Sequence, residues 1–571
     1  MNLTFDVSRT PFSRLGSYFA VAWRDRSDLS LGLGLYLRSV HGMGVAVPDL
    51  FRIEWADGTP LTLDQVEADP VHLTIRHPSG GHAAVCITDP TTVRVRGQDV
   101  PGLRFSTIPD VGLVVYPAEA GRWVVNRRRS YRRYGFEAIA GGLAADAPTE
   151  LTRRHTLAHP HAAMVVTGDA EGGFDLAIDE LTASWDLRPR PPFDACLVQV
   201  QADFDAWLAG MPAVAPQWQP ALDWAAYVDW SCVVEPCDRL KRPAMFMSKN
   251  HMNQVWSWDH CFNAMALVYG HPELAYDQLM MMADHQDAHG AYPDGVNDFV
   301  LHYNFSKPPV HGWALGLMRD RAPALFTEQR LAEAYASFSR LAAWWLTYRV
   351  APGNRLPYYL HGNDSGWDNS TMFDQGVPLI APDLAAVLAE HCFQIADVAE
   401  QLARGEDARR WRATAQRLVD DLLATLWRED HFVALRQVDG AVVDCESLVP
   451  CIPIVLGERL PVDVRQSLVG RIRRFVTEHG LATEHPDSPH YEPDGYWRGP
   501  IWAPSTLLIV SGLAAVGEHA LARTISERFC RTCARSGFAE NFDALTGEGL
   551  RDPAYTWTAS VFIVLAHEVA S

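Results

Sequence analysis

The spacing of apolar residues in this chain changes near residue 205. Before that point, apolar residues recur at every second position, and after it they recur at every third or fourth. A period of two is typical of a half-buried β-strand, and a period near 3.6 is typical of an α-helix. The sequence therefore predicts a multidomain protein, with a β domain and its linker over residues 1–205 and an all-α domain over residues 206–571.

The first region predicts an antiparallel β-sandwich. Leucines occupy every second position from Leu29 to Leu37, and similar short apolar runs follow between Gly, Pro and Asp residues. Short strands separated by such turns are typical of sandwiches. The predicted strands cover residues 29–37, 50–55, 71–76, 92–96, 112–116, 122–126 and 163–167.

The second region predicts twelve helices, joined by long loops rich in polar and aromatic residues. Twelve helices fit an (α/α)6 barrel, with six inner and six outer helices, in which the loops at one end of the inner helices build the site. The predicted helices cover residues 217–234, 259–269, 272–287, 308–319, 327–349, 382–403, 406–427, 446–455, 461–478, 500–516, 518–536 and 557–570.

Charge and composition exclude several classes of protein. With 69 acidic and 49 basic residues the net charge is −20, which disfavours binding to a phosphate backbone. The sequence holds no apolar run of the ~18–20 residues that span a bilayer. It shows no secretory signal at its start, and ten cysteines are too few for a disulfide framework. We therefore expect a cytoplasmic protein without nucleic-acid or membrane partners; the sequence does not indicate its oligomeric state.

Five segments mix carboxylates or amides with aromatic residues, a composition that is costly in a core. They cover residues 256–259, 286–294, 361–370, 496–502 and 540–549. Several of the 19 tryptophans lie in them. Flat indoles beside carboxylates suit sugar rings, which have apolar C–H faces and a rim of hydroxyls. The alternative is that these tryptophans are simply large, buried side chains.

Three of these segments resemble motifs of the clan G glycoside hydrolases. Residues 365–370, Ser-Gly-Trp-Asp-Asn-Ser, are similar to the general-acid motif; residues 496–502 are similar to a sugar-binding loop; and residues 540–549 are similar to the general-base motif. The resemblance covers about residues 205–571 and is strongest to family 63, which groups processing α-glucosidases with bacterial mannosylglycerate and glucosylglycerate hydrolases. The family 37 trehalases are more distant. Ala544 stands where the family has proline, and Asn541-Phe542 where tyrosines are usual.

The resemblance implies an inverting, exo-acting α-glycosidase with Asp368 as general acid and Glu540 as general base. Inversion needs two carboxyl groups ~6.5–9.5 Å apart with a water beside the base. We expect partial burial beside Trp367 to keep the proton on Asp368, and a more polar, wetter pocket to keep Glu540 ionised. Glu548 is the alternative base, and a helix N-cap is the alternative role for Asp368.

Four of these segments, together with Trp557, supply the candidates for sugar binding. A capping role is the alternative for Asp259, and a structural ion pair is the alternative for Arg498. We also expect Pro308-Pro309 and the residues from His311 to Trp313 to help wall the pocket. The predicted substrate-binding residues are Trp258, Asp259, Gln286, Asp287, Trp367, Trp497, Arg498, Trp502 and Trp557.

The predicted reaction is release of glucose from a small α-glucoside, with glucosylglycerate, mannosylglycerate, kojibiose-like disaccharides and trehalose as candidates. Proton transfer and an activated water supply the chemistry, so no cofactor is expected. His285 and His289 have a spacing that can hold zinc, but the sequence offers no persuasive third ligand, and no calcium loop of the EF-hand type is present. We therefore expect no metal.

Two other functions remain open at this point. A sugar epimerase or isomerase on the same barrel would use a histidine pair as acid and base, drawn from His285, His289, His302 and His311. A non-catalytic glycan-binding protein would have lost one of the two carboxylates. Both carboxylates are present, which favours the hydrolase.

Overall fold

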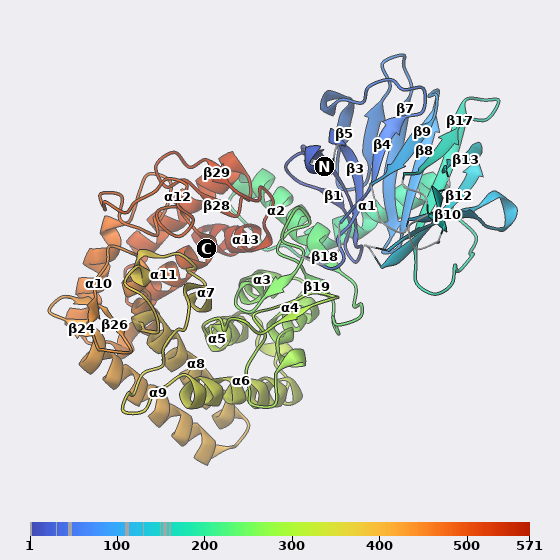
Figure 1. Ribbon diagram of the computed structural model, residues 1–571. Coiled ribbons are helices and arrows are strands. Elements are labelled where there is room, and N and C mark those ends of the chain that lie inside the picture. Colours follow the sequence, from blue (N-terminus) through green and yellow to red (C-terminus); the bar gives the residue numbers. More distant parts are fainter. Residues whose placement is uncertain are drawn as a thin grey trace. The chain divides into compact units, whose positions relative to one another are not determined.

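The computed structural model describes residues 3–29, 31–43, 48–108, 113–128, 131–148, 150–151, 157–158 and 161–570. Residues 30 and 112, which belong to two predicted strands, lie outside these ranges. The chain forms two compact units (Figure 1). The first contains Met1–Ala209, Ala226–Gln254 and Asn297–Val300, and the second contains Gly210–Ala225, Val255–Val296 and Leu301–Ser571.

The first unit contains two large antiparallel sheets, of seven and eight strands, which confirms the predicted sandwich class. One sheet runs in the order β1 (Phe12–Ser13), β2 (Phe19–Arg26), β3 (Gly32–Ser39), β4 (Asp49–Trp55), β9 (Leu103–Thr107), β16 (Ala163–Thr167) and β13 (Gly142–Asp146). The other runs in the order β10 (Val114–Pro117), β11 (Trp123–Arg127), β12 (Arg132–Ala140), β17 (Gly173–Leu181), β8 (Thr92–Gln98), β7 (His82–Asp89), β6 (Leu73–Arg76) and β5 (Val66–Ala68).

The core of this unit lies between the two sheets. Leu35 and Leu37 of β3 pair with Ile53 and Phe51 of β4, and all four are buried. Phe51 then meets Phe136 of the opposite sheet, with ring centroids 5.2 Å apart. Leu35 and Leu37 therefore lie on the inward face of β3, as a period of two requires, whereas Leu33 near the start of the strand is exposed.

The helical period begins earlier than residue 205. Helix α1 (Phe193–Ala209) buries five residues at spacings of three or four, and it belongs to the first unit. These five residues are Phe193, Cys196, Val200, Phe204 and Trp207.

Six helical elements of the second unit form a closed inner ring. In ring order they are α3 (Asp259–Leu267), α5 (His311–Arg321), α8 (Pro382–Gln401), the 3-10 helix η8 (Val449–Arg459), α11 (Ala503–Ala515) and α13 (Thr556–Ala570). Each contacts the next, and α13 contacts α3. This ring is the inner layer of the predicted (α/α)6 barrel.

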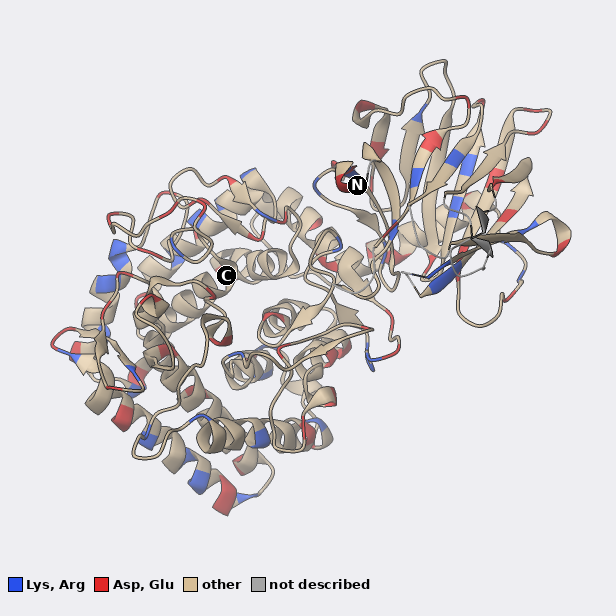
Figure 2. Cartoon of the chain, in the orientation of Figure 1, with Lys and Arg blue, Asp and Glu red and all other residues tan. Residues whose placement is uncertain are grey.

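The outer layer consists of amphipathic helices that each contact the inner ring or a loop beside it. They are α4 (Pro272–Met280), α6 (Glu328–Tyr348), α9 (Gly405–Leu426), α10 (Val462–Arg474) and α12 (His519–Ser536). The first half of α2 (Gln219–Cys232) belongs to the same unit. Charged residues gather on the outer helices, whereas the inner ones are largely uncharged (Figure 2). The difference follows from burial, since charges are rarely left unpaired in a core.

Two predicted helices differ from the structure. The sequence predicts an α-helix over residues 446–455, but η8 is a 3-10 helix, and Pro453 inside it lacks the N–H that an α-helix needs. The helix predicted over residues 272–287 ends at Met280. Within the described residues, no helix is both long enough and apolar enough to cross a bilayer.

Candidate active site

The candidate site lies where the loops that precede the inner helices meet, within the second unit. Asp259 is the first residue of α3, and Lys307 lies four residues before α5. The Nζ of Lys307 is 3.3 Å from Oδ1 of Asp294 and 3.9 Å from Oδ1 of Asp368. The hydroxyl of Tyr496 donates to Oδ2 of Asp368 at 3.4 Å. Segments more than 100 residues apart thus surround one cluster of carboxylates.

Glu540 belongs to the same cluster. The charge of Asp368 acts on its carboxyl group, and both carboxyls act on the hydroxyl of Tyr496. The backbone of Glu540 is held on both sides: its N–H donates to the carbonyl of Asp552 at 2.7 Å, and its carbonyl accepts from Nε1 of Trp557 at 3.3 Å. Asp368 and Glu540 are therefore close enough for their charges to interact.

The surroundings of Glu540 differ from the sequence expectation. The sequence predicts a wetter pocket for Glu540, but this residue is only 4% exposed, whereas the Asp368 side chain is 25% exposed. Burial, reinforced by the charge of Asp552, raises the pKa of Glu540 to about 7. The strand β28 (Asn541–Phe542), which pairs with β29 (Gly549–Leu550) and bridges to Ile501, draws this segment inward.

Asp259 and Asp294 add two more buried carboxyl groups. Burial raises the pKa of Asp259 to about 8 and also raises that of Asp294, while the Lys307 ammonium opposes both shifts. Carboxyl groups that lack a full set of partners accept hydrogen bonds from sugar hydroxyls well. The N-cap of α3 is Trp258, so the alternative capping role of Asp259 does not apply.

Asp294 and Lys307 were not predicted from the sequence. The signal for Lys307 was its rarity: this chain has only three lysines among its 49 basic residues, Lys241, Lys249 and Lys307. Two of the three, Lys249 and Lys307, are buried. A buried lysine in an arginine-rich chain indicates a position where a compact ammonium suits better than a guanidinium.

The five predicted tryptophans form one packed cluster. Trp497 stacks on Trp502 with centroids 4.0 Å apart, and Trp367 lies 4.8 Å from Trp497. Trp557 meets both Trp502 and Trp258 edge to face, at 5.4 and 6.1 Å. All five residues are buried. In this structure they support the loops of the site more than they offer open faces for stacking on a sugar.

The tryptophan cluster also positions Asp368. Gly366 has a φ of +78°, and a Cβ there would come within 2.5 Å of the Trp258 ring, so that only glycine lets the turn approach this closely. The N-cap of the following 3-10 helix η7 (Thr371–Phe373) is Ser370, whose side chain accepts from the N–H of Met372. The alternative capping role of Asp368 therefore does not apply.

Arg498 joins two of the predicted motifs. Its Nε donates to the carbonyl of Asn369 at 2.8 Å, and its guanidinium forms an ion pair with Asp374. Asn369 in turn accepts from the N–H of Trp497 at 2.9 Å. The structural ion pair that the sequence left open for Arg498 is thus present, and it holds the loop of Trp497 against the loop of Asp368.

Gln286 and Asp287 have structural partners instead of open positions in the site. The amide nitrogen of Gln286 donates to the carbonyls of Gly290 and Ser337, both at 2.9 Å. The Asp287 carboxylate accepts from the N–H of Ala291 at 2.8 Å and so closes its own loop. We therefore leave both residues out of the proposed site.

The remaining candidates lie elsewhere. Glu548, the alternative base, is in an exposed turn, and His289 is exposed beside Tyr348 at 3.1 Å. His311 is buried against His260, with ring centroids 5.0 Å apart. Of the four histidines considered for an epimerase, His302 lies beside the carboxylates, where it acts on the Asp294 carboxyl.

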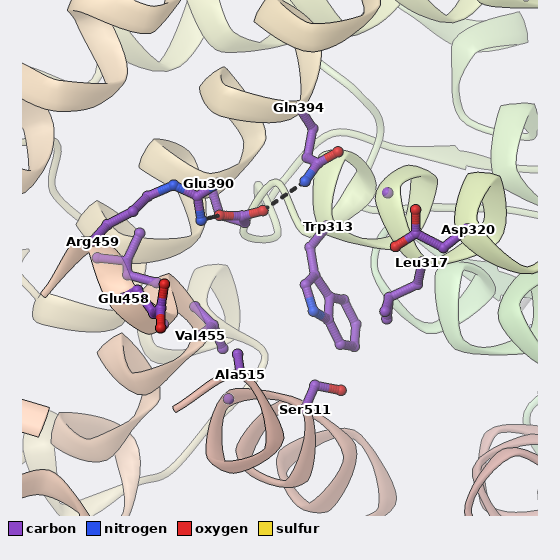
Figure 3. Close-up of a pocket in the computed structure, with 14 residues that line it drawn as sticks. Trp313, Leu317, Asp320, Glu390, Gln394, Val455, Glu458, Arg459, Ser511 and Ala515 are labelled. Atoms are coloured by element: carbon purple, nitrogen blue, oxygen red, sulfur yellow. Dashed lines mark hydrogen bonds and ion pairs between the residues drawn. The ribbon is translucent and has the colours of Figure 1, made fainter. Parts of the chain in front are cut away.

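Trp313 lines a different cavity, of about 550 Å³ (Figure 3). Its walls come from later turns of α5, α8 and α11 and from η8. Glu390 in this wall pairs with Arg459 at 2.8 Å and accepts from Gln394 at 2.8 Å. None of the carboxylates of the candidate site lines this cavity, so the two are separate.

The pKa of Glu540 leads to a prediction about pH. A general base must be ionised, and a raised pKa keeps Glu540 protonated up to about pH 7. We expect kcat/KM on a substrate without an ionisable group to fall as the pH decreases through about 7, and Asp552→Asn to move this limb to lower pH by removing a neighbouring charge. Initial rates from about pH 4 to 9 give the pH at which kcat/KM falls, in the unaltered protein and in Asp552→Asn. An acid limb that stays in place in Asp552→Asn would contradict the assignment.

Comparisons with known proteins show that this chain resembles glycoside hydrolases. The sequence model of the "mannosylglycerate hydrolase MGH1-like glycoside hydrolase domain" matches residues 252–558. A mannosylglycerate hydrolase of Rubrobacter radiotolerans is 25% identical over 402 residues, which cover 54% of this chain and 89% of that protein. A glucosylglycerate hydrolase of Mycolicibacterium hassiacum is 24% identical over 408 residues, covering 54% and 91%.

Two solved structures show the same fold. A family 63 mannosylglycerate hydrolase from Thermus thermophilus, in complex with Tris, superposes with a TM-score of 0.52 at 19% identity, covering 60% of this chain and 99% of that chain. A bacterial glucoamylase complexed with acarbose superposes with a TM-score of 0.60 at 11% identity, covering 100% of this chain and 96% of that one. The glucoamylase likeness extends over both units, whereas the hydrolase likeness covers little more than the length of the barrel.

Proposed function

This chain belongs to the mannosylglycerate hydrolase MGH1-like glycoside hydrolase family, and on that premise we propose that it releases one terminal hexose from a small α-glycoside with inversion. The single observation that carries the proposal is the pair Asp368 and Glu540. These two carboxyls come from separate loops, the charge of Asp368 acts on the Glu540 carboxyl, and the charges of Asp368, Asp294 and Lys307 act on Asp259.

The proposed reaction needs only these side chains and water. Asp368 donates its proton to the glycosidic oxygen as the bond from this oxygen to the anomeric carbon breaks. Glu540 takes a proton from a water, whose oxygen bonds to the anomeric carbon from the opposite face. The products are the free aglycone alcohol and a hexose of inverted configuration. The Tyr496 hydroxyl and the Lys307 ammonium hold the Asp368 carboxyl in place.

The names of the relatives support a hexosyl glycerate as the substrate. Mannosylglycerate and glucosylglycerate differ only in the orientation of one hydroxyl on the hexose. Within the site, Asp259 and Asp294 are buried carboxyls available for hydroxyls of the hexose. We propose glucosides as the preferred class, with mannosylglycerate as the competing substrate. A discrimination of this kind rests on one or two hydrogen bonds.

The experiment is an NMR assay of the first anomer released. The whole chain is incubated with glucosylglycerate, mannosylglycerate, a kojibiose-type disaccharide and trehalose, and the sugar signals are followed before mutarotation. We expect the β-anomer first and the highest kcat/KM on glucosylglycerate. The α-anomer first would overturn inversion, and faster turnover of mannosylglycerate would overturn the glucoside preference. Melting shifts with ligands but no turnover would favour the glycan-binding alternative.

A further inference from the structure

A buried group of metal-binding side chains lies inside the barrel, next to the proposed active site and not used by it. It consists of His260 and Cys261 in the first turn of α3 and His311 at the start of α5, and these two helices contact each other. The ligand atoms of the three residues lie within 4.8 Å of one another. Corners of an equilateral triangle of that side are about 2.8 Å from its centre, close to the ~2.0–2.3 Å of zinc–ligand bonds.

His311 is the observation that points to a ligand. It is 1% exposed, and neither of its ring nitrogens has a hydrogen-bond partner among the described residues. A buried polar atom without a partner is costly, and native proteins rarely leave two on one ring. Burial lowers the pKa of His311 well below its usual value, so the ring is neutral and retains a lone pair for a metal.

His260 is already oriented as a metal ligand. Its Nδ1 is 2.8 Å from the carbonyl of Trp256, so this nitrogen carries the proton and Nε2 carries the lone pair. A hydrogen bond of this kind from the second ring nitrogen is the usual support of metal-bound histidines. The Nε2 atom lies 3.7 Å from Sγ of Cys261, as two ligands of one ion would.

The neighbouring histidine does not belong to the group. His391 accepts from the N–H of Gly312 at Nδ1 and donates to the carbonyl of Phe338 at Nε2, each at 3.0 Å, so neither nitrogen has a lone pair left. The rings of Tyr292 and Phe338 lie 5.0 and 5.7 Å from His311 and supply an apolar surrounding. The donor set is therefore two imidazoles and one thiol.

We propose that His260, Cys261 and His311 bind one zinc ion. Two imidazoles and a thiolate are ligands that zinc prefers, and a water can occupy the fourth position. Binding replaces the Cys261 thiol by a thiolate, and the released proton goes to solvent. Because the ion would join the first turn of α3, which carries Asp259, to the first turn of α5, its role is to fix one wall of the active site.

The test measures metal binding directly. The whole chain is produced in zinc-supplemented medium, dialysed and analysed for metal content; a second sample is refolded with Co²⁺ for absorption spectroscopy. We expect one zinc per chain, a thiolate-to-cobalt charge-transfer band and the visible bands of tetrahedral cobalt. Since the site is buried, refolding provides the route of entry for cobalt. Zinc should also raise the melting temperature.

Two variants and one matched control make the result specific. Cys261→Ser should lose the charge-transfer band and bind zinc at least ~100-fold more weakly. This loss exceeds the usual effect of removing a residue that only hydrogen-bonds to a metal ligand. His311→Gln should lose the tetrahedral spectrum. Cys451→Ser changes another buried cysteine and should leave both unchanged. Absence of bound metal in the unaltered chain, or an unchanged cobalt spectrum in Cys261→Ser, would overturn the proposal.

Discussion

Replacement of Asp368 by Asn is expected to lower kcat/KM on a glycoside with a poor leaving group by about 10²–10⁴-fold, because the glycosidic oxygen would leave without a proton. On a hexosyl fluoride, whose leaving group needs little protonation, the loss should be much smaller. The measurement is the ratio of kcat/KM for a glycerate glycoside and for the fluoride of the same hexose. Asparagine keeps the shape of the side chain, so its melting temperature should stay close to that of the unaltered protein.

The control for this variant is Asp374→Asn. Asp374 follows Asp368 by six residues and pairs with Arg498, so its loss disturbs the same loop without removing a proton donor. We expect Asp374→Asn to reduce stability and to leave the ratio between the two substrates unchanged. If Asp368→Asn lost equal activity on both substrates, Asp368 would not be the general acid.

Replacement of Glu540 by Gln is expected to lower kcat/KM by about 10²–10⁴-fold on both substrates equally, because activation of the water is needed whatever group leaves. The matched control is Glu548→Gln, eight residues further along in an exposed turn, which should retain nearly full activity. Parallel initial-rate measurements on the glycerate glycoside and the fluoride distinguish the two. Full loss in Glu548→Gln would move the base to that residue.

This pair of variants also tests which carboxyl has which role. Glu540 is the more buried of the two residues, and its pKa is about 7, a property that also suits a proton donor. If the roles were reversed, the loss in Glu540→Gln would depend on the leaving group and the loss in Asp368→Asn would not. The leaving-group dependence of the two variants, and not the pKa alone, therefore decides which carboxyl is the general acid.

Much of the fold followed from local sequence patterns. The leucine alternation of β3 and the amphipathic outer helices reflect which face of an element is buried. The spacing of apolar residues along one segment determines that face. Pro453 of η8 is also visible in the local sequence, but the apolar spacing alone predicts an α-helix where the structure has a 3-10 helix. Helix α1 was missed because its apolar spacing was assigned to the β region.

Residues close together in the chain were enough to predict the two fold classes, the family resemblance and the two carboxyls Asp368 and Glu540. The burial of Glu540, the presence of Lys307 and Asp294 in the site, and the use of Gln286 within its own loop became apparent only from the folded chain. Burial, charge pairing and hydrogen bonding depend on which distant segments meet, and a pattern along one segment carries no information about its partners.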